Sequence, residues 1–165
     1  MNLARFALVA AAAGVFGTLV TPAEAQMLQR KDLSMEGALA IATTAIADCK
    51  AKGWAVSVTV VGRNGEVLAQ LRGDGTGPHT TENSFKKAFT SRTFRIPSGE
   101  MEERLKKNPQ MGAQYLTGFT TGRGALPIKI GEETIAAAGA SGAPGGEKDE
   151  ACIQAGIDKV KAQLN

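Results

Sequence analysis

The sequence predicts an α+β domain in which helices pack on an antiparallel sheet. Residues 54–61 and 66–72 are rich in β-forming residues and flank Asn64-Gly65, a dipeptide typical of tight hairpin turns. Residues 126–130 and 134–140 form a second such pair around a Gly-Glu-Glu turn. Helical patterns lie before, between and after these hairpins. Because hairpins dominate over strand–helix–strand units, we expect antiparallel pairing within a single domain.

Residues 1–25 have the features of a secretory signal peptide. Arg5 supplies a positive charge, residues 6–20 form a nearly unbroken apolar run, and Ala23 and Ala25 provide small side chains at the −3 and −1 cleavage positions. The apolar run is shorter than a comfortable membrane span. We therefore expect cleavage after this segment, one domain over residues 26–165, and a periplasmic or secreted location.

The charge balance argues against two classes of partner. The chain has 19 Lys and Arg against 16 Asp and Glu, which gives a net charge of +3. This small excess is spread along the sequence, unlike the concentrated basic face of a nucleic-acid-binding protein. No second apolar run has the length of a membrane span. We expect neither a nucleic-acid partner nor a membrane-spanning segment after signal cleavage.

The first helix is predicted over residues 33–52. Ser34 is a typical N-cap residue, and Gly53 is typical of the position after a helix C-terminus. Apolar residues recur every three or four positions, which places them on one helix face. We expect that face to enter the core through Met35, Leu39, Ala42, Ile46 and Cys49.

The second helix is predicted to have Thr80 or Thr81 as its N-cap and to end near Phe94, before the helix-breaking Pro97. A short, charged helix over residues 99–108 should follow. On the second helix we expect one face toward the core and the other in solvent, which assigns Phe85, Ala88 and Phe89 to the core and Lys86, Lys87 and Arg92 to the solvent.

The two cysteines are predicted to form a disulfide. A final helix over residues 147–164 places Ile153, Ile157, Val160 and Leu164 on one face. If it packs antiparallel to the first helix, Cys49 near the end of one meets Cys152 near the start of the other. An oxidising compartment favours the bond, and two buried free thiols are the alternative. One His and two Cys give zinc no convincing ligand set.

Separated motifs over residues 33–164 resemble the GlcG/HbpS-like family of haem-degrading or haem-binding domains. In LRGDGTGPHTTENSFKKAFTSRTFRIPS the matching residues are Arg72, Asp74, Gly75, Lys87, Ala88, Thr90, Pro97 and Ser98. In GRGALPIKIGEETIAAAGASGA they are Gly124, Pro127, Ile128, Gly139, Ser141 and Gly142. Asp149 matches the acidic residue that opens the family's last helix. Ser91 and Arg123 replace the usual alanine and glycine.

This resemblance implies a three-layer α/β/α domain of the profilin-like type, with a five-stranded antiparallel sheet, and assembly into homo-oligomers. It also implies haem or a related tetrapyrrole as the ligand, bound for sequestration or sensing. Other members accompany glycolate metabolism or form a domain of corrinoid adenosyltransferases. The alternatives are therefore an enzyme that degrades haem or acts on a small anionic oxidised carbon substrate, and an accessory subunit that modulates a partner enzyme.

Under this resemblance His79 is the candidate axial ligand of haem iron, since imidazole is the commonest such ligand. It follows a Gly-rich turn that admits a flat ligand, and it precedes a helix with free backbone N–H groups. The other candidate haem contacts are Thr80, the wall residue Phe85, and the propionate partners Arg72, Lys86 and Lys87. A solvated or capping role for His79 is the alternative. A threonine-based haem site at Thr80 or Thr81 is a further alternative, and the alternative ligands are Tyr115, Met101 and Met111.

Overall fold

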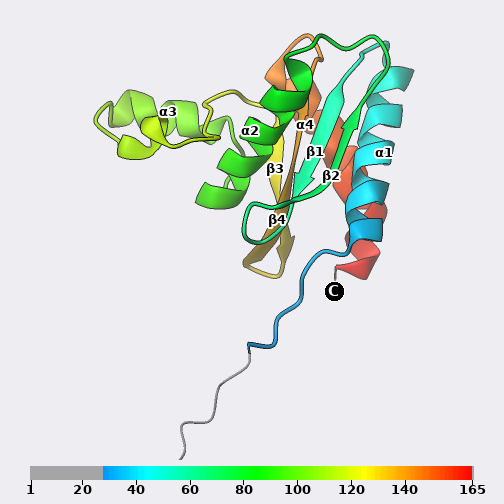
Figure 1. The fold of residues 1–165 in the computed structure, drawn as a ribbon, viewed down its shortest axis with the longest axis horizontal. Coiled ribbons are helices and arrows are strands. Elements are labelled where there is room, and N and C mark those ends of the chain that lie inside the picture. The colour runs from blue at the N-terminus through cyan, green and yellow to red at the C-terminus, as the bar shows by residue number, and fades with distance from the viewer. Residues whose placement is uncertain (1–27, 165) are drawn as a thin grey trace, which may run out of the picture.

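The computed structural model describes residues 28–164, and the predicted signal peptide lies outside this range (Figure 1). The elements are α1 (Met35–Ala51), β1 (Ser57–Val61), β2 (Val67–Arg72), α2 (Thr80–Phe94), α3 (Glu100–Lys107), the 3₁₀ turn η1 (Gly112–Tyr115), β3 (Ala125–Ile130), β4 (Glu133–Ser141), α4 (Gly146–Val160) and the 3₁₀ turn η2 (Lys161–Gln163). Every helix and strand predicted from the sequence is present, with shifted ends. Across the described range, no helix combines the length and the hydrophobicity needed to cross a membrane.

Four strands form one antiparallel sheet in the order β2-β1-β4-β3. Both predicted hairpins are confirmed, with β1 paired to β2 and β3 paired to β4. Gly65 in the first turn has a φ of 84°, a left-handed conformation that glycine adopts without steric strain. The hairpins join through β1 and β4, whose pairing runs from Ser57 with Ser141 to Val61 with Ala137.

The five-stranded sheet implied by the family resemblance is wrong for the described residues, which form four strands. The β-rich segments of the sequence also numbered four, so the fifth strand rested on the resemblance alone. The long connection between α3 and β3, residues 108–124, contains Pro109, Gly112, Gly118 and Gly122 and forms a 3₁₀ turn and bends. Proline disfavours a strand because it lacks the backbone N–H that pairs with a neighbouring strand, and glycine disfavours one because ordering it costs more conformational entropy.

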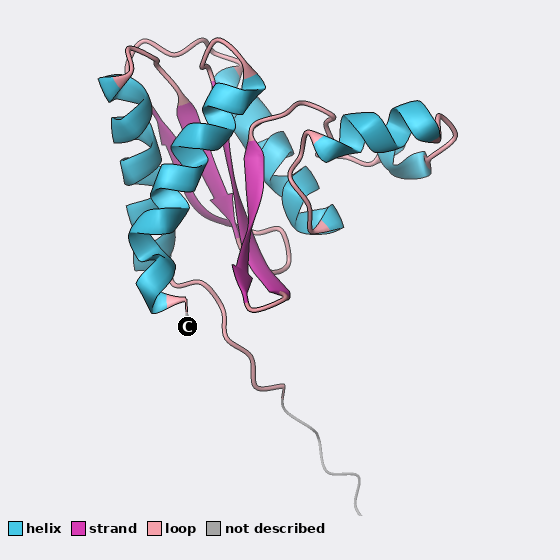
Figure 2. Ribbon diagram, turned by 180° about the vertical axis from the view of Figure 1, so that it is seen from behind, coloured by secondary structure: helices cyan, strands magenta, loops and turns pink. Residues whose placement is uncertain are grey.

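Helices cover both faces of the sheet, so the molecule has three layers (Figures 1 and 2). On one face α1 and α4 pack side by side over Val58 and Val60, in the main apolar core. On the other face α2 lies over Ser57, Thr59 and Val61. Because successive strand residues point to opposite faces, β1 presents aliphatic side chains to one layer and mainly hydroxyls to the other.

The buried face of α1 differs from the predicted one. Met35 and Leu39 are 58% and 42% exposed, whereas the fully buried residues are Ala38, Ile41, Ala42, Ala45 and Cys49. Close approach of α4 selects this stripe, since a Cβ on Gly156 would lie 2.5 Å from the carbonyl oxygen of Ile41. Small residues allow the two helices to pack at this distance, and the larger Met35 and Leu39 are left at the edge.

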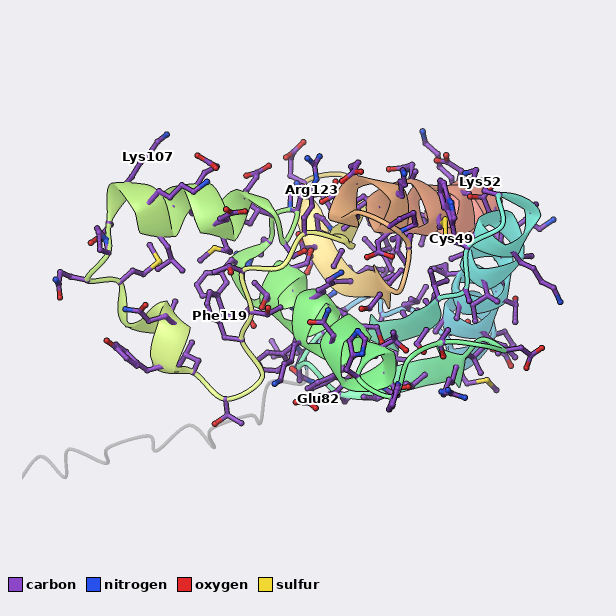
Figure 3. The ribbon with its side chains drawn as sticks, turned by 90° about the horizontal axis from the view of Figure 1, so that it is seen from above. Cys49, Lys52, Glu82, Lys107, Phe119 and Arg123 are labelled. Carbon is purple, nitrogen blue, oxygen red and sulfur yellow. A yellow bond between two sulfur atoms is a disulfide. The ribbon has the colours of Figure 1, made fainter. Side chains whose placement is uncertain are left out.

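The predicted disulfide is confirmed. Cys49 and Cys152 are bonded across the α1–α4 contact, and both are completely buried. Figure 3 shows the bond between the last turn of α1 and the middle of α4, as antiparallel packing of the two helices allows. The bond joins residues 103 positions apart, so it restricts most of the described chain.

Two predictions for α2 are wrong. The N-cap position belongs to His79, so Thr80 and Thr81 lie in the first turn of the helix. Lys87, expected in solvent, is 5% exposed. The helix ends at Phe94 as predicted, because Arg95 adopts a left-handed backbone with a φ of 61° and Pro97 follows closely.

Candidate functional site

Two neighbouring concave regions share the segment 53–55, which contains the chain's single tryptophan, Trp54. The first, here called the polar pocket, has a volume of about 570 Å³ and lies between the start of α2 and the start of α4. The second, here called the apolar groove, has a volume of about 630 Å³ and lies between α1 and the end of β2. Trp54 therefore contributes a wall to both.

The loop between β2 and α2 borders both regions, and backbone contacts fix its path. Gly73 donates its N–H to the carbonyl of Val56, and a Cβ at Gly73 would lie 2.5 Å from that oxygen. Gly75 then turns the chain with a φ of 76°. Thr76 is buried and donates its hydroxyl to the carbonyl of Gly73. Gly73 therefore allows the close backbone approach, and Gly75 allows the turn.

His79 ends this loop and is exposed at the wall of the polar pocket. Its side chain makes no capping hydrogen bond, and its ring lies against Gly77, where a Cβ would be 2.9 Å from the imidazole Cε1. The next residue, Thr80, is buried, donates its hydroxyl to Gly77 and accepts a hydrogen bond from Ser57. Thr80 therefore anchors the helix start, and the imidazole of His79 takes no part in the helix cap.

A buried ion pair forms part of the pocket's lining. Lys87 Nζ lies 2.8 Å from Asp149 Oδ2 and donates a second hydrogen bond to the carbonyl of Ala140. Asp149 Oδ1 accepts the N–H of Ala143, so the pair connects α2, β4 and the loop before α4. Burial raises the pKa of Asp149 above its ordinary value, and the attraction of Lys87 opposes this effect without cancelling it.

Motif residues that lie far apart in the sequence surround this ion pair. Gly124 has a φ of 135°, and a Cβ there would lie 2.7 Å from Lys87 Nζ and 2.9 Å from Asp149 Cβ. Ser141 accepts a hydrogen bond from Asn83 at the edge of the same pocket. The motifs that carried the family resemblance therefore meet at one place, where they tie α2 and α4 to the sheet.

The apolar groove has a different character. Its walls include Ile46 from α1, Val56, and Leu71 from β2, together with Trp54. Two cationic residues, Lys50 and Arg72, also line it. The guanidinium of Arg72 donates a hydrogen bond to the carbonyl of Thr76, so this side chain also helps to hold the loop before α2.

The structure brings together some of the candidate haem contacts and separates others. His79, Thr80 and Lys87 line the polar pocket, and Arg72 lines the neighbouring groove. Phe85 stacks with Phe89 at a centroid distance of 5.7 Å, next to Gly118, and lines neither region. Lys86 pairs with Glu82 on the surface of α2 and also lies outside both.

The alternative ligands have other surroundings. Tyr115 is 82% exposed on η1, Met101 is fully buried on α3, and neither they nor Met111 line the pocket or the groove. Among the described residues, no group of three or more His, Cys, Asp and Glu side chains has the arrangement of a metal-ion site. Of the histidine, tyrosine and methionine candidates, His79 is the one that lines the pocket or the groove.

Sequence reasoning missed Trp54 and the apolar residues of the groove. A single tryptophan directly after a predicted helix end was a usable signal, because large aromatic side chains at junctions commonly form walls of sites. Lys87 and Asp149 were both motif residues, but their pairing required the tertiary contact between α2 and α4.

Residues 33–158 match the model of a family described as haem degrading protein HbpS-like. A crystal structure of HbpS is 34% identical, covers 81% of this chain and 93% of its own, and has a TM-score of 0.76. A double mutant of HbpS from Streptomyces reticuli is 33% identical, with coverages of 86% and 97% and a TM-score of 0.76.

A structure of PduOC in complex with haem shares the fold at 18% identity, with coverages of 77% and 94% and a TM-score of 0.70. No curated protein matches the chain. Since the family model spans most of the sequence and HbpS exceeds 30% identity over 81% of it, this chain belongs to the HbpS-like family.

Proposed function

We propose that this protein binds haem or a related tetrapyrrole at the polar pocket and the apolar groove. The observation that carries the proposal is the position of His79, the single histidine of the chain. It is exposed at the polar pocket, whose wall residue Trp54 also lines the groove. The description of the family as haem-degrading and the haem complex of PduOC support the same ligand class.

The residues present fit the chemistry of haem, whose iron accepts an imidazole nitrogen while its ring requires apolar contacts. His79 would supply the nitrogen, since its ring carries no capping hydrogen bond. Ile46, Leu71 and Trp54 would contact the macrocycle through the groove. A large flat ligand with two charged groups matches a surface that is apolar on one side of Trp54 and polar on the other.

The propionates need cationic or N–H partners, and Lys50 and Arg72 at the groove are the best placed. Lys87 is a weaker choice, because its ammonium already holds Asp149 and the carbonyl of Ala140. Lys86 and Phe85 lie outside both regions, so we expect them to contribute little to affinity. Binding in this form serves sequestration or sensing and requires no turnover.

The test is a haemin titration of purified protein, followed by Soret absorbance and by the fluorescence of Trp54. We expect saturable binding that quenches Trp54, since haem absorbs its emission at short distance. The His79→Ala variant should lose the Soret shift and weaken binding at least about tenfold, the equivalent of about 1.4 kcal/mol. The matched control is Lys86→Ala, on the same helix but outside both regions.

Each result has a distinct meaning. Binding that His79→Ala leaves unchanged, with the same Soret maximum, overturns His79 as the ligand. If haemin quenches Trp54 in both His79→Ala and Lys86→Ala, haemin still binds at the proposed site and a residue other than His79 ligates the iron. Absence of saturable binding in the wild type overturns the whole proposal.

A second candidate function is catalysis on a small anionic oxidised carbon substrate in the polar pocket. The observation that favours it is the buried pair of Lys87 and Asp149 beside His79, because perturbed carboxylates in a pocket are common in active sites. Turnover of such substrates by iron-free protein, lost in His79→Ala, would favour this function over haem binding.

We also propose that the chain is exported and that residues 1–25 are removed. The sequence features of that segment and the oxidised Cys49–Cys152 pair support a compartment outside the cytosol. The intact mass of protein purified from a periplasmic fraction tests this, and a mass that retains residues 1–25 would contradict it.

A further inference from the structure

A third concave region, which we call the terminal cavity, has a volume of about 380 Å³. Its lining comes from the segment before α1, the start of α1, the hairpin of β3 and β4, and the end of α4 with η2. Figure 1 shows the C-terminal end of the chain beside the start of α1. The cavity shares no residue with the polar pocket or the apolar groove. It and Trp54 lie at opposite ends of α1, whose 17 residues span about 25 Å.

The floor of the terminal cavity is aliphatic. Ile135 of β4 and Val160 at the end of α4 are buried and belong to the main apolar core. Three partly buried residues that pack against this core complete the apolar lining: Leu33, Ile130 and Leu164. A ligand in this cavity would therefore place an apolar part against the core of the domain.

A β-bulge directs Ile135 to this side of the sheet. The partners of Ile128 and Lys129 on β4 are Ala136 and Thr134. Ile135 is therefore an extra residue of β4 with no partner on β3. Neighbouring strand residues normally point to opposite faces, but Ile135 and Ala136 both pack in the main apolar core. Bulges commonly redirect a side chain beside a site, and this one adds an aliphatic side chain to the cavity lining.

Arg63 fixes one wall of the terminal cavity. Its side chain, which is 11% exposed, extends from the turn between β1 and β2 to the segment before α1. There Nε donates to Asp32 Oδ1 at 2.5 Å, and Nη2 donates to the carbonyl of Lys31 at 2.6 Å. The same guanidinium pairs with Glu133 at the start of β4. Lys31 and Asp32 both line the cavity, so these contacts hold its wall in place before a ligand arrives.

The charges of the lining favour an anionic ligand. Among the described residues that line the cavity, Lys31 and Asp32 are the charged ones, and Ser34 and Gln163 add uncharged polar groups. Asp32 is held by Arg63, whereas Lys31 has no ion-pair partner within residues 28–164. The lining thus combines an aliphatic surface with one uncompensated cation. It is complementary to a molecule with an apolar tail and one negative charge.

We propose that the terminal cavity binds an aliphatic monocarboxylate of medium chain length. The alkyl chain lies against Ile135 and Val160, and the carboxylate lies at the rim beside Lys31. Small-molecule sites have volumes of about 300–1,000 Å³, and this cavity is at the lower end of that range. It therefore fits one short chain better than a tetrapyrrole. The proposal is separate from haem binding, because the two sites have no residue in common.

The test is a calorimetric titration of the purified protein with sodium octanoate. We expect saturable binding of one octanoate per chain. Lys31→Glu should raise the dissociation constant at least about tenfold, because it replaces attraction of the carboxylate by repulsion. The matched control is Lys161→Glu, which makes the same change of charge on η2 but outside the cavity lining. Far-UV circular dichroism confirms that each variant remains folded.

A second variant and a second probe test the two ends of the ligand separately. Leu164→Asp places a charge in the aliphatic lining, so it should also weaken octanoate binding at least about tenfold. Octylammonium has the same alkyl chain and the opposite charge, and it should bind the wild type at least about tenfold more weakly than octanoate. Equal affinities for the two probes overturn the proposal of a carboxylate site.

Three other results also overturn the proposal. One is the absence of saturable octanoate binding to the wild type up to millimolar concentrations. Another is an octanoate affinity that neither Lys31→Glu nor Leu164→Asp changes, which places the probe elsewhere. Octanoate should leave Trp54 fluorescence and haemin affinity unchanged, and a change in either places octanoate in the apolar groove. The octanoate titration needs no haemin, so the two binding proposals succeed or fail separately.

Discussion

The two faces of the sheet are held to their helices in different ways. Under α1 and α4 the contacts are aliphatic, with Val58 and Val60 in the core and a disulfide between the helices. Under α2 they are directional, with Ser57 bonded to Thr80 and Thr59 bonded to Ser84. Contacts on the apolar face stabilise the fold in proportion to the apolar surface that they bury. Hydrogen bonds on the polar face fix the position of α2, whose first turn lines the candidate site.

Backbone proximity completes the polar face. A Cβ at Gly139 of β4 would lie 2.6 Å from the carbonyl oxygen of Ser84 and 2.7 Å from the amide nitrogen of Ala88. The ion pair of Lys87 and Asp149 then ties α2 to the start of α4. The domain therefore has most of its apolar core on the α1–α4 side, whereas directional contacts fix the side that carries His79, Thr80 and Lys87.

The largest effect is expected from removing the disulfide on the apolar side. The Cys49→Ala/Cys152→Ala variant should lose about 4 kcal/mol of unfolding free energy, because the bond closes a loop of 103 residues in sequence separation. Urea denaturation of both proteins measures the difference. Equal midpoints in the two proteins would contradict the prediction, and wild type unfolded in reductant serves as an independent control.

The next effect concerns the ion pair on the polar side. Lys87→Met should lose about 3 kcal/mol of unfolding free energy, since it leaves the Asp149 carboxylate buried without its cation. The Lys87→Met/Asp149→Leu variant should recover part of this loss. Lys86→Met is the matched control, because Lys86 pairs with Glu82 at the surface. If Lys86→Met and Lys87→Met were equally stable, the pair would have no special role.

Adjacent residues of β1 allow a direct comparison of the two faces. Val58→Ala should cost about 2 kcal/mol of unfolding free energy through lost apolar contact in the main core. Thr59→Val should cost about 1 kcal/mol, because Thr59 bonds both Ser84 and Gln70. Thr59→Val should also weaken haemin binding more than Val58→Ala does. The reverse order of affinities in a haemin titration would contradict the proposed roles of the two faces.

The smallest effect is the pH dependence due to Asp149. Burial raises its pKa in the folded protein above the ordinary 3.8, so the folded state binds this proton more tightly than the unfolded state does. Its stabilising contribution is present at low pH and is lost as the pH rises through the raised pKa. Unfolding free energies of wild type and Asp149→Asn at several pH values measure this difference.

Glu82 provides the control of opposite sign. Lys86 lowers the pKa of Glu82, first through the side-chain hydrogen bond, so its contribution is present above 4.5 and is lost as the pH falls through the lowered pKa. The wild type should lose stability relative to Asp149→Asn as the pH rises, and relative to Glu82→Gln as it falls. If both differences in unfolding free energy changed with pH in the same direction, the opposite pKa shifts of Asp149 and Glu82 would be contradicted.

Local patterns were sufficient for much of the fold. Alternating apolar residues located the strands, and apolar residues at every third or fourth position located the helices. Asn64-Gly65 marked the first hairpin, and Ser34 was confirmed as a helix N-cap. The antiparallel arrangement of the first and last helices then predicted the disulfide correctly. These features depend on short-range propensities or on a simple topology, so the sequence contains the information directly.

The candidate site was only partly predictable. His79 and Thr80 at the start of α2 and Lys87 two turns further along line one pocket, and their proximity in sequence made them visible together. Phe85 and Lys86 lie on other sides of the same helix, because each residue advances about 100° around the helix axis. Trp54, Ile46 and Leu71 come from three different elements, and no local pattern indicated that they share a groove.

By itself the sequence determined the order of elements and the two hairpins, because spacing and turn chemistry act over a few residues, and it determined the pairing of its two cysteines, because the simple topology leaves the two terminal helices as neighbours. The tertiary structure alone decided which stripe of α1 is buried, where Lys87 finds Asp149, and how Trp54 joins the groove to the pocket. Those outcomes depend on how closely helices approach one another and the sheet. Packing distance is a property of all the layers together, which no single segment specifies.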